Sequence, residues 1–163
     1  MKLRYDLQEL LHQKEREFIK RIEKYCAQHN IEFEDAHADH ATGIDVIINK
    51  LAYDIKVSEH DKLSYWRKTP TGYEYEPHMT HTRIPYLICK NDGKIYKLTK
   101  QEFRDYVNDL REQGKLDEMT HLHCGDGNEN RAVDISHFLD AAHLFMELND
   151  NTDRWATFAH KAV

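Results

Sequence analysis

Two aspartates and a lysine in the first half of the chain carry the clearest chemical meaning. They lie in two short apolar segments rich in β-branched residues, Gly43–Ile48 and Leu51–Val57, which are separated by two polar residues. This pattern predicts two antiparallel strands joined by a tight turn. In that register Asp45 lies directly opposite Asp54, and Lys56 projects from the same face of the hairpin. Because opposed carboxylates repel each other, we expect a divalent cation to hold the pair together.

A resemblance to a known superfamily rests on this order of residues. This order resembles the motif of the PD-(D/E)XK nuclease superfamily, because Asp45 is followed by a hairpin and then by Asp54-x-Lys56. The superfamily includes restriction-endonuclease-like and Holliday-junction-resolvase-like enzymes. The resemblance covers about residues 11–100, with Ile44 where the motif has proline and aspartate where it commonly has glutamate. It implies an α/β nuclease fold, Mg²⁺ bound by the paired acids, and a lysine near the attacking water.

A predicted helix over about residues 3–29 precedes the hairpin and offers a further acid. Its apolar side chains follow the spacing of an amphipathic helix, at Leu3, Leu7, Leu11, Phe18, Ile22 and Tyr25. Glu15 lies on this apolar stripe, so we expect it to support the metal, with Glu17 and Glu23 as the alternatives. The competing interpretation is a charged helix whose polar face only contacts solvent.

Phosphodiester hydrolysis explains why these residue types would stand together. Mg²⁺ prefers oxygen ligands and is usually held by one or two carboxylates, together with water and substrate phosphate. Asp45 and Asp54 would supply the carboxylates, and the resemblance adds the carbonyl of Ile55. Lys56 would hold or deprotonate the attacking water, and Mn²⁺ would substitute for Mg²⁺. The alternative is a surface hairpin with an Asp54–Lys56 ion pair and no metal.

Basic side chains concentrate after the proposed site, where they could contact phosphate. Residues 62–104 hold nine basic and four acidic side chains, which suits a nucleic-acid-binding rim beside an acidic metal site. Within this region the turn at Thr69–Gly72 separates aromatic and basic segments and predicts a hairpin. Its aromatic side chains would stack on bases or pack on the core. The candidate phosphate contacts are Lys62, Arg67, Lys68, Lys94, Lys97 and Lys100.

Further along the chain, apolar runs predict a strand hairpin over about residues 84–98 and then a helix. Thr99 and Glu102 have the spacing of a capping box, so the helix is expected to begin directly after Thr99. A last helix is expected over about residues 134–148, because apolar side chains recur there with helical spacing. It would belong to a C-terminal helical extension over about residues 133–163.

A second cluster of metal-binding residue types lies at His121, His123 and Cys124. Zinc takes such ligands, usually four in a tetrahedral arrangement. However, no second paired cluster follows at a familiar spacing, and a chain with 12 histidines groups some of them easily. The sequence therefore favours magnesium over zinc.

Composition is that of a folded domain. Hydrophobic residues make up 40% and charged residues 32% of the 163 residues, the balance of a soluble folded protein rather than of a disordered one. The sequence has no apolar run near 18 residues and no recognisable leader, so we expect no membrane association. Three cysteines without a CxxC pair fit reduced thiols and a cytoplasmic location.

Together these features predict one α/β domain over residues 1–163. A restriction-endonuclease-like core over about residues 11–113 would consist of a central mixed β-sheet flanked by helices. The predicted function is metal-dependent hydrolysis of phosphodiester bonds by a DNA endonuclease, with DNA favoured over RNA, and the resemblance makes a homodimer reasonable. The alternatives are a catalytically silent binding module with the same fold, acting on nucleic acid or a protein partner, and a zinc-stabilised His/Cys domain.

Overall fold

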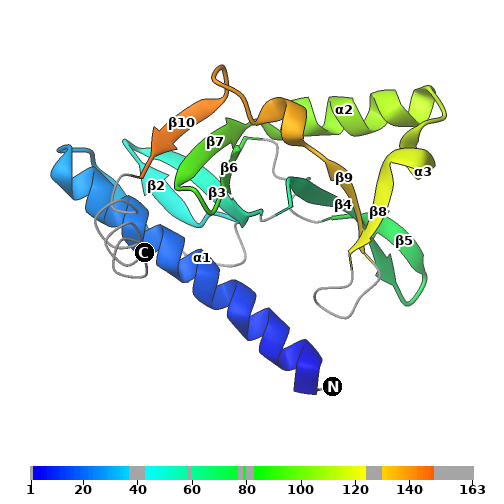
Figure 1. Ribbon diagram of the computed structural model, residues 1–163, viewed down its shortest axis with the longest axis horizontal. Coiled ribbons are helices and arrows are strands. Elements are labelled where there is room, and N and C mark those ends of the chain that lie inside the picture. Colours follow the sequence, from blue (N-terminus) through cyan, green and yellow to red (C-terminus); the bar gives the residue numbers. More distant parts are fainter. Residues whose placement is uncertain are drawn as a thin grey trace, which may run out of the picture.

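The computed structural model describes residues 2–36, 43–58, 60–76, 79, 83–123 and 130–148 (Figure 1). In chain order its elements are α1 (Lys2–Gln28), β1 (Phe33–Asp35), β2 (Val46–Ile48), β3 (Leu51–Val57), β4 (Lys62–Thr69), β5 (Gly72–Tyr75), β6 (Tyr86–Cys89), β7 (Lys94–Leu98), α2 (Lys100–Glu112), α3 (Leu116–Met119), β8 (Thr120–His123), β9 (Asn130–Asp134), the 3₁₀ helix Ser136–Phe138 and β10 (Leu144–Glu147). The predicted α/β class and the long N-terminal helix are confirmed. Within the described residues, no helix combines the length and apolar character that a membrane crossing requires.

A six-stranded mixed sheet lies at the centre of the molecule, as predicted. Its strand order is β1-β2-β3-β6-β7-β10; the β3–β6 pair is parallel and the other neighbouring pairs are antiparallel. On one face, Ile22 of α1 packs into a core with Ile55 and other strand residues. On the other face, Phe103 of α2 packs into a second core with Ile88 (Figure 1). The sheet therefore separates two hydrophobic cores.

The β2–β3 hairpin has the predicted register. Ile48 pairs with Leu51, and Val46 pairs with Tyr53. The turn residues Asn49 and Lys50 have φ angles of 50° and 68°, the left-handed values that a two-residue type I′ turn requires. Asparagine adopts this conformation readily, and lysine adopts it at some cost. The paired residues end at Val46 and Tyr53, and the Asp45 N–H donates to the Tyr53 carbonyl, so the ladder does not continue to the predicted pair of Asp45 directly opposite Asp54.

A second, four-stranded sheet with the order β5-β4-β9-β8 lies beside α2 and is absent from the sequence-based expectations. Its β4–β5 hairpin closes at Thr69–Gly72, which confirms the hairpin predicted there. Gly72 has a φ angle of +135°, a conformation that side chains other than hydrogen rarely allow. The β4–β9 pairing shifts register between Ser64 and Trp66, so β4 contains a bulge at Tyr65.

Helix α2 begins directly after Thr99, as predicted. Thr99 is the N-cap: its hydroxyl accepts the N–H of Glu102, and the Glu102 carboxylate accepts the N–H of Thr99. Gly114 follows the helix with a φ angle of +69°, and the Lys115 N–H then donates to the carbonyl of Leu110. The first helical residue, Lys100, is consequently held at a defined height beside the central sheet.

The helix predicted over residues 134–148 is wrong. This segment forms the end of β9, a 3₁₀ helix and the strand β10, which pairs with β7 at the edge of the central sheet. The physical reason lies in the two cores: Phe138 packs into the α2 core, whereas Met146 and Leu148 pack into the α1 core. One straight helix cannot reach both faces of the sheet. The remainder of the predicted extension, residues 149–163, lies outside the described residues.

Candidate metal and hydrolysis site

Asp45 lies where the β2–β3 ladder ends, and its carboxylate is tied to the backbone of β3. Its N–H donates to the carbonyl of Tyr53 at 2.9 Å, and its Oδ2 accepts the N–H of Ile55 at 2.7 Å. Burial raises the pKa of this carboxyl to about 7, with further contributions from the negative charges of Glu15 and Asp54. The Ile55 hydrogen bond and Lys56 act in the opposite direction. Asp45 is therefore a crowded acid that a cation would stabilise.

Asp54 lies in the middle of β3, between β2 and β6, and is only 4% exposed. Its N–H donates to the carbonyl of Pro85 at 2.9 Å, as the parallel pairing with β6 requires. Its Oδ1 lies 3.9 Å from the Lys56 ammonium, which is an ion-pair distance without a close hydrogen bond. The motif residues on β3 therefore share one face, as the period-2 geometry predicts.

Lys100 contacts the same carboxylate from α2. Its Nζ donates to Asp54 Oδ2 at 3.0 Å and lies 4.9 Å from the centre of the Tyr86 ring. The Lys100 side chain has no solvent exposure, and burial lowers its pKa while Asp54 raises it. The predicted contact of Lys100 with phosphate at the surface is wrong, because its ammonium is enclosed beside Asp54.

The acids of α1 differ in how they relate to this site. Glu15 is half-buried, and its charge is the largest single-group contribution that raises the pKa of Asp45. Glu17 and Glu23 are exposed. Of the three candidates, Glu15 is thus the acid whose charge acts on Asp45, in agreement with its place on the apolar stripe of the helix.

The charges of this constellation suit one divalent cation. Asp45 and Asp54 interact with two ammonium groups, Lys56 and Lys100, and the charge of Glu15 acts on Asp45. Among the described residues, no three His, Cys, Asp or Glu side chains come close enough to form a ready-made metal cluster. Mg²⁺ does not need one, since two carboxylates with water and phosphate are its usual protein environment. The donor set therefore fits Mg²⁺ bound chiefly through Asp45 and Asp54.

The remaining predicted phosphate contacts are scattered. Lys62, which begins β4, is partly exposed, and its backbone is held by the Ser58 hydroxyl. Lys94 and Lys97 are also partly exposed, but Lys97 pairs with Leu87 and so projects from the face opposite Asp54. The side chains of Arg67, Lys68, His121 and His123, and all of Cys124, lie outside the described residues.

A second ionic cluster, which the sequence did not reveal, joins α2 to the loop before β10. His143 contacts Asp140 through Nδ1 at 2.7 Å and Glu102 through Nε2 at 2.9 Å. These two carboxylates raise the pKa of His143. Glu102 also completes the capping box at Thr99, so this cluster supports the turn of helix that carries Lys100.

Comparisons with known proteins find no matching family, curated protein or solved structure. The resemblance to the nuclease superfamily therefore depends on the β2–β3 hairpin and on the groups that surround it.

Proposed function

We propose that this protein is a magnesium-dependent phosphodiesterase that cuts nucleic acid, with DNA as the favoured substrate. The observation that carries the proposal is the burial of Asp45 beside the negative charges of Glu15 and Asp54, which together raise its pKa to about 7, while Lys56 lies 3.9 Å from Asp54. Perturbed acids next to a lysine are characteristic of hydrolytic sites, and a divalent cation would relieve their repulsion. The restriction-endonuclease-like core, the homodimer and the cytoplasmic location belong to the same proposal.

Each residue would have a distinct part in this reaction. Asp45 and Asp54 would hold the cation, together with the carbonyl of Ile55, and the cation would acidify water and offset charge on the phosphate. Asp45 Oδ2 already accepts the Ile55 N–H, so its other oxygen would be the one available to the ion. Lys56, with a side chain 32% exposed, would orient the attacking water and the scissile phosphate.

Lys100 would act by positioning. Its hydrogen bond takes up Asp54 Oδ2, which leaves Oδ1 on the side of Lys56. Because the Lys100 side chain is fully buried at the start of a capped helix, it fixes the Asp54 carboxylate in one orientation. Its charge also lowers the total negative charge of the site, which favours one cation over two.

The test is cleavage of plasmid, single-stranded DNA, branched DNA and RNA with Mg²⁺, Mn²⁺ or EDTA. Lys56→Ala removes the partly exposed lysine and leaves the buried Asp54 paired with Lys100, and Lys24→Ala removes an exposed lysine of α1 as the control. We expect metal-dependent cutting by the wild type and Lys24→Ala, and at least a hundredfold slower cutting by Lys56→Ala. Cutting that persists in Lys56→Ala would contradict the assignment.

A second candidate function is a catalytically silent binding module, and one observation favours it. The Lys100 ammonium already neutralises Asp54 at 3.0 Å, so the fold can keep a buried aspartate without any metal. A protein of this kind would bind nucleic acid or a protein partner without Mg²⁺ dependence. Absence of cutting by folded protein on every substrate, with no binding of Mn²⁺, would select this function.

A further inference from the structure

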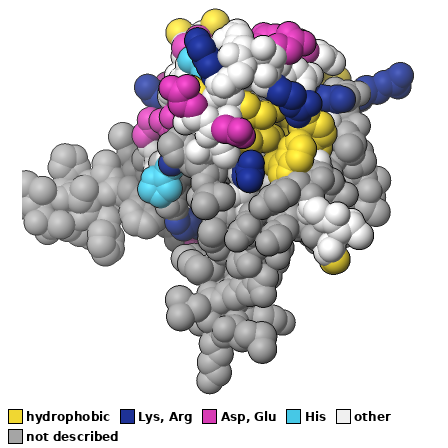
Figure 2. Space-filling view, turned by 90° about the vertical axis from the view of Figure 1, so that its right-hand side faces the viewer, with side chains coloured by type: hydrophobic (Ala, Val, Ile, Leu, Met, Phe, Trp, Pro, Cys, Tyr) yellow, Lys and Arg dark blue, Asp and Glu magenta, His cyan; other side chains and the backbone are white. Residues whose placement is uncertain are grey.

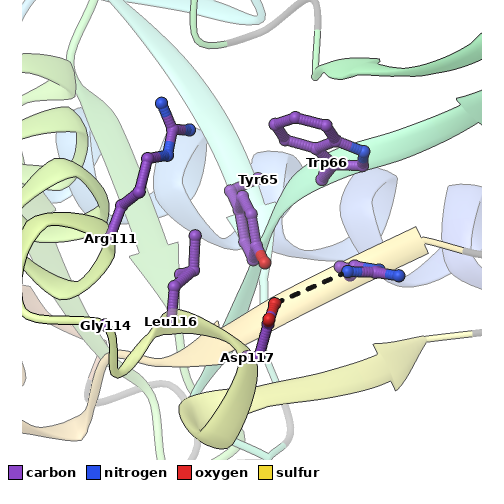
Figure 3. Close-up of a pocket in the computed structure, with 7 residues that line it drawn as sticks. Tyr65, Trp66, Arg111, Gly114, Leu116 and Asp117 are labelled. Carbon is purple, nitrogen blue, oxygen red and sulfur yellow. Dashed lines mark ion pairs between the residues drawn. The ribbon is translucent and has the colours of Figure 1, made fainter.

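A cavity of about 260 Å³ lies between the second sheet and the end of α2, away from the paired aspartates (Figure 3). It is lined by Tyr65, Trp66, Arg111, Gly114, Leu116, Asp117 and Arg131. At about 30 Å³ per liquid water molecule, it would hold roughly nine waters. Figure 2 views the molecule from the side of α3 and β5 and shows hydrophobic side chains at the surface with Lys and Arg side chains nearby.

The bulge in β4 builds the aromatic wall of this cavity. In a regular strand, consecutive residues point to opposite faces, yet Tyr65 and Trp66 both line the cavity. The register shift between Ser64 and Trp66 makes this arrangement possible, because a bulge re-aims the side chains that follow it. Trp66 pairs directly with Arg131 of β9, so an aromatic ring and a guanidinium stand side by side on neighbouring strands.

The aromatic wall is held in place by its neighbours. The Tyr65 hydroxyl lies 2.7 Å from the Thr120 hydroxyl, which in turn donates to the carbonyl of Leu116 at 2.6 Å. The Trp66 ring packs edge-on against Tyr75, with 5.2 Å between ring centres. These contacts hold the two aromatic side chains of the wall in a defined position.

Two arginines, Arg111 and Arg131, line the cavity. Arg111, from the last turn of α2, is exposed and lies over the Tyr75 ring at 5.2 Å. Arg131 lies 3.8 Å from Asp117, whose side chain is 96% exposed. An ion pair at that distance with one partner in solvent contributes little to stability. The cavity thus combines an aromatic surface with two groups that bind phosphate in a planar fork.

We propose that this cavity receives one unpaired nucleotide of a nucleic-acid strand, with its base against Trp66 and its phosphate between Arg111 and Arg131. A bare anion would not need the aromatic wall, and an aliphatic ligand would not need two guanidiniums. Stacking on an aromatic side chain and backbone contact by arginine together characterise single-stranded recognition. A paired base in a duplex cannot enter, because both of its faces are covered.

The cavity and the proposed cleavage site lie at opposite ends of α2. Lys100 at its start contacts Asp54, and Arg111 near its end lines the cavity. At 1.5 Å per helical residue, the two ends are about 16 Å apart. This span corresponds to roughly five nucleotides of a B-form strand. The inference rests on the proposed function in this one respect, that the strand held at the cavity is the strand that is cut.

The test uses Trp66 as its own reporter and includes no divalent metal. The chain has two tryptophans, so Trp155→Phe leaves Trp66 as the only one. In EDTA, this protein would be titrated with a DNA hairpin that contains one unpaired thymidine, the same hairpin fully paired, and thymidine monophosphate. We expect saturable quenching of fluorescence by the hairpin with the unpaired base, and at least tenfold weaker binding of the other two probes.

Variants then locate the binding. Arg111→Gln changes an exposed side chain and is expected to weaken binding about tenfold, as loss of a charged hydrogen bond does. Arg104→Gln is the matched control, because it removes a guanidinium from α2 outside this cavity. Unchanged affinity of Arg111→Gln, equal weakening by Arg104→Gln, or equal quenching by paired and unpaired hairpins would overturn the proposal. Equal affinity for thymidine monophosphate would overturn it in favour of a free-nucleotide site.

The two proposals fail separately. If the protein binds the unpaired base through Arg111 but cuts no substrate, hydrolysis is refuted and the cavity assignment stands. If it cuts DNA through Lys56 while Arg111→Gln binds like the wild type, the cavity assignment is refuted and hydrolysis stands.

Discussion

Lys100 and Asp54 form a buried ion pair: the ammonium donates to the carboxylate at 3.0 Å, and the side chains are 0% and 6% exposed. The pair joins the first turn of α2 to the middle of the central sheet. Neither charge can be released to water without opening the α2 core, in which Phe103 and Tyr86 pack edge-on beside it. The proposed metal ligand is therefore also a structural residue.

Replacing Asp54 should consequently destabilise the fold as well as the site. Asp54→Asn leaves the Lys100 ammonium buried without a counter-charge, which costs about 3–5 kcal/mol of unfolding free energy. Asp54→Asn combined with Lys100→Met removes both charges and should recover most of that loss. Urea unfolding of the three proteins measures this. If the single variant lost less than about 1 kcal/mol, the pair would not be buried as described.

The raised pKa of Asp45 predicts how stability depends on pH. The folded protein holds this proton up to a pH of about 7, whereas the unfolded chain releases it near 3.8, so the folded state binds more protons between these values. Stability from this group is therefore fully present below the unfolded pKa and is lost as the pH rises towards 7. Asp45→Asn should stabilise the metal-free protein at pH 8 by about 2 kcal/mol.

Thermal unfolding at several pH values in EDTA tests this prediction. His143 has a raised pKa as well, and its contribution is also lost as the pH rises, so both groups act in the same direction. Comparing Asp45→Asn with His143→Gln separates them: only the double variant should have a nearly flat profile between pH 5 and pH 8. A wild-type profile that rose through this range would contradict both assignments.

The N-cap of α2 should contribute to both stability and the site. Thr99→Ala removes the hydroxyl that accepts the Glu102 N–H, which costs about 1 kcal/mol. Thr99→Ser keeps that hydroxyl and should behave like the wild type. Because Lys100 follows directly, Thr99→Ala should also slow cleavage at a stability that still keeps the protein folded. Loss of stability with an unchanged cleavage rate would show that Lys100 does not depend on the cap.

Two glycines with positive φ, Gly93 and Gly114, test whether Leu148 packs against the turn between β6 and β7. Gly93, with φ +89°, lies so close to Leu148 that an added Cβ would be 2.7 Å from the Leu148 carbonyl oxygen. Gly114, with φ +69°, has no heavy atom within 4 Å of such a Cβ. Gly114→Ala should cost about 1 kcal/mol from backbone strain alone. Gly93→Ala should cost a further ~1–3 kcal/mol from overpacking, and equal losses would place Leu148 elsewhere.

Local patterns in the sequence predicted much of the fold and the centre of the site. The register of the β2–β3 hairpin follows from two adjacent strands and a two-residue turn, and the start of α2 follows from Thr99 and Glu102. These features depend on neighbours in the chain. The pattern of apolar residues in 134–148 fitted a helix equally well, because it cannot specify which of two cores each side chain enters.

Local sequence patterns could not predict contacts between segments that are distant along the chain. The ammonium of Lys100 reaches Asp54 only because the β6–β7 hairpin brings the start of α2 back over β3. A lysine at the start of a helix otherwise reads as a surface residue, which led to its assignment as a phosphate contact. The bulge at Tyr65 is hidden for the same reason, since it depends on the partner strand β9.

Binding of Mn²⁺, measured by electron paramagnetic resonance at pH 8, tests the paired-aspartate metal site most directly. The wild type and Lys24→Ala should bind one Mn²⁺ per chain, and Lys56→Ala should bind it at least as tightly because a competing positive charge is gone. Asp45→Asn, which should be the more stable protein, should lose this binding, so unfolding cannot explain the loss. Absence of bound Mn²⁺ in the wild type, or equal binding by Asp45→Asn, would contradict the account.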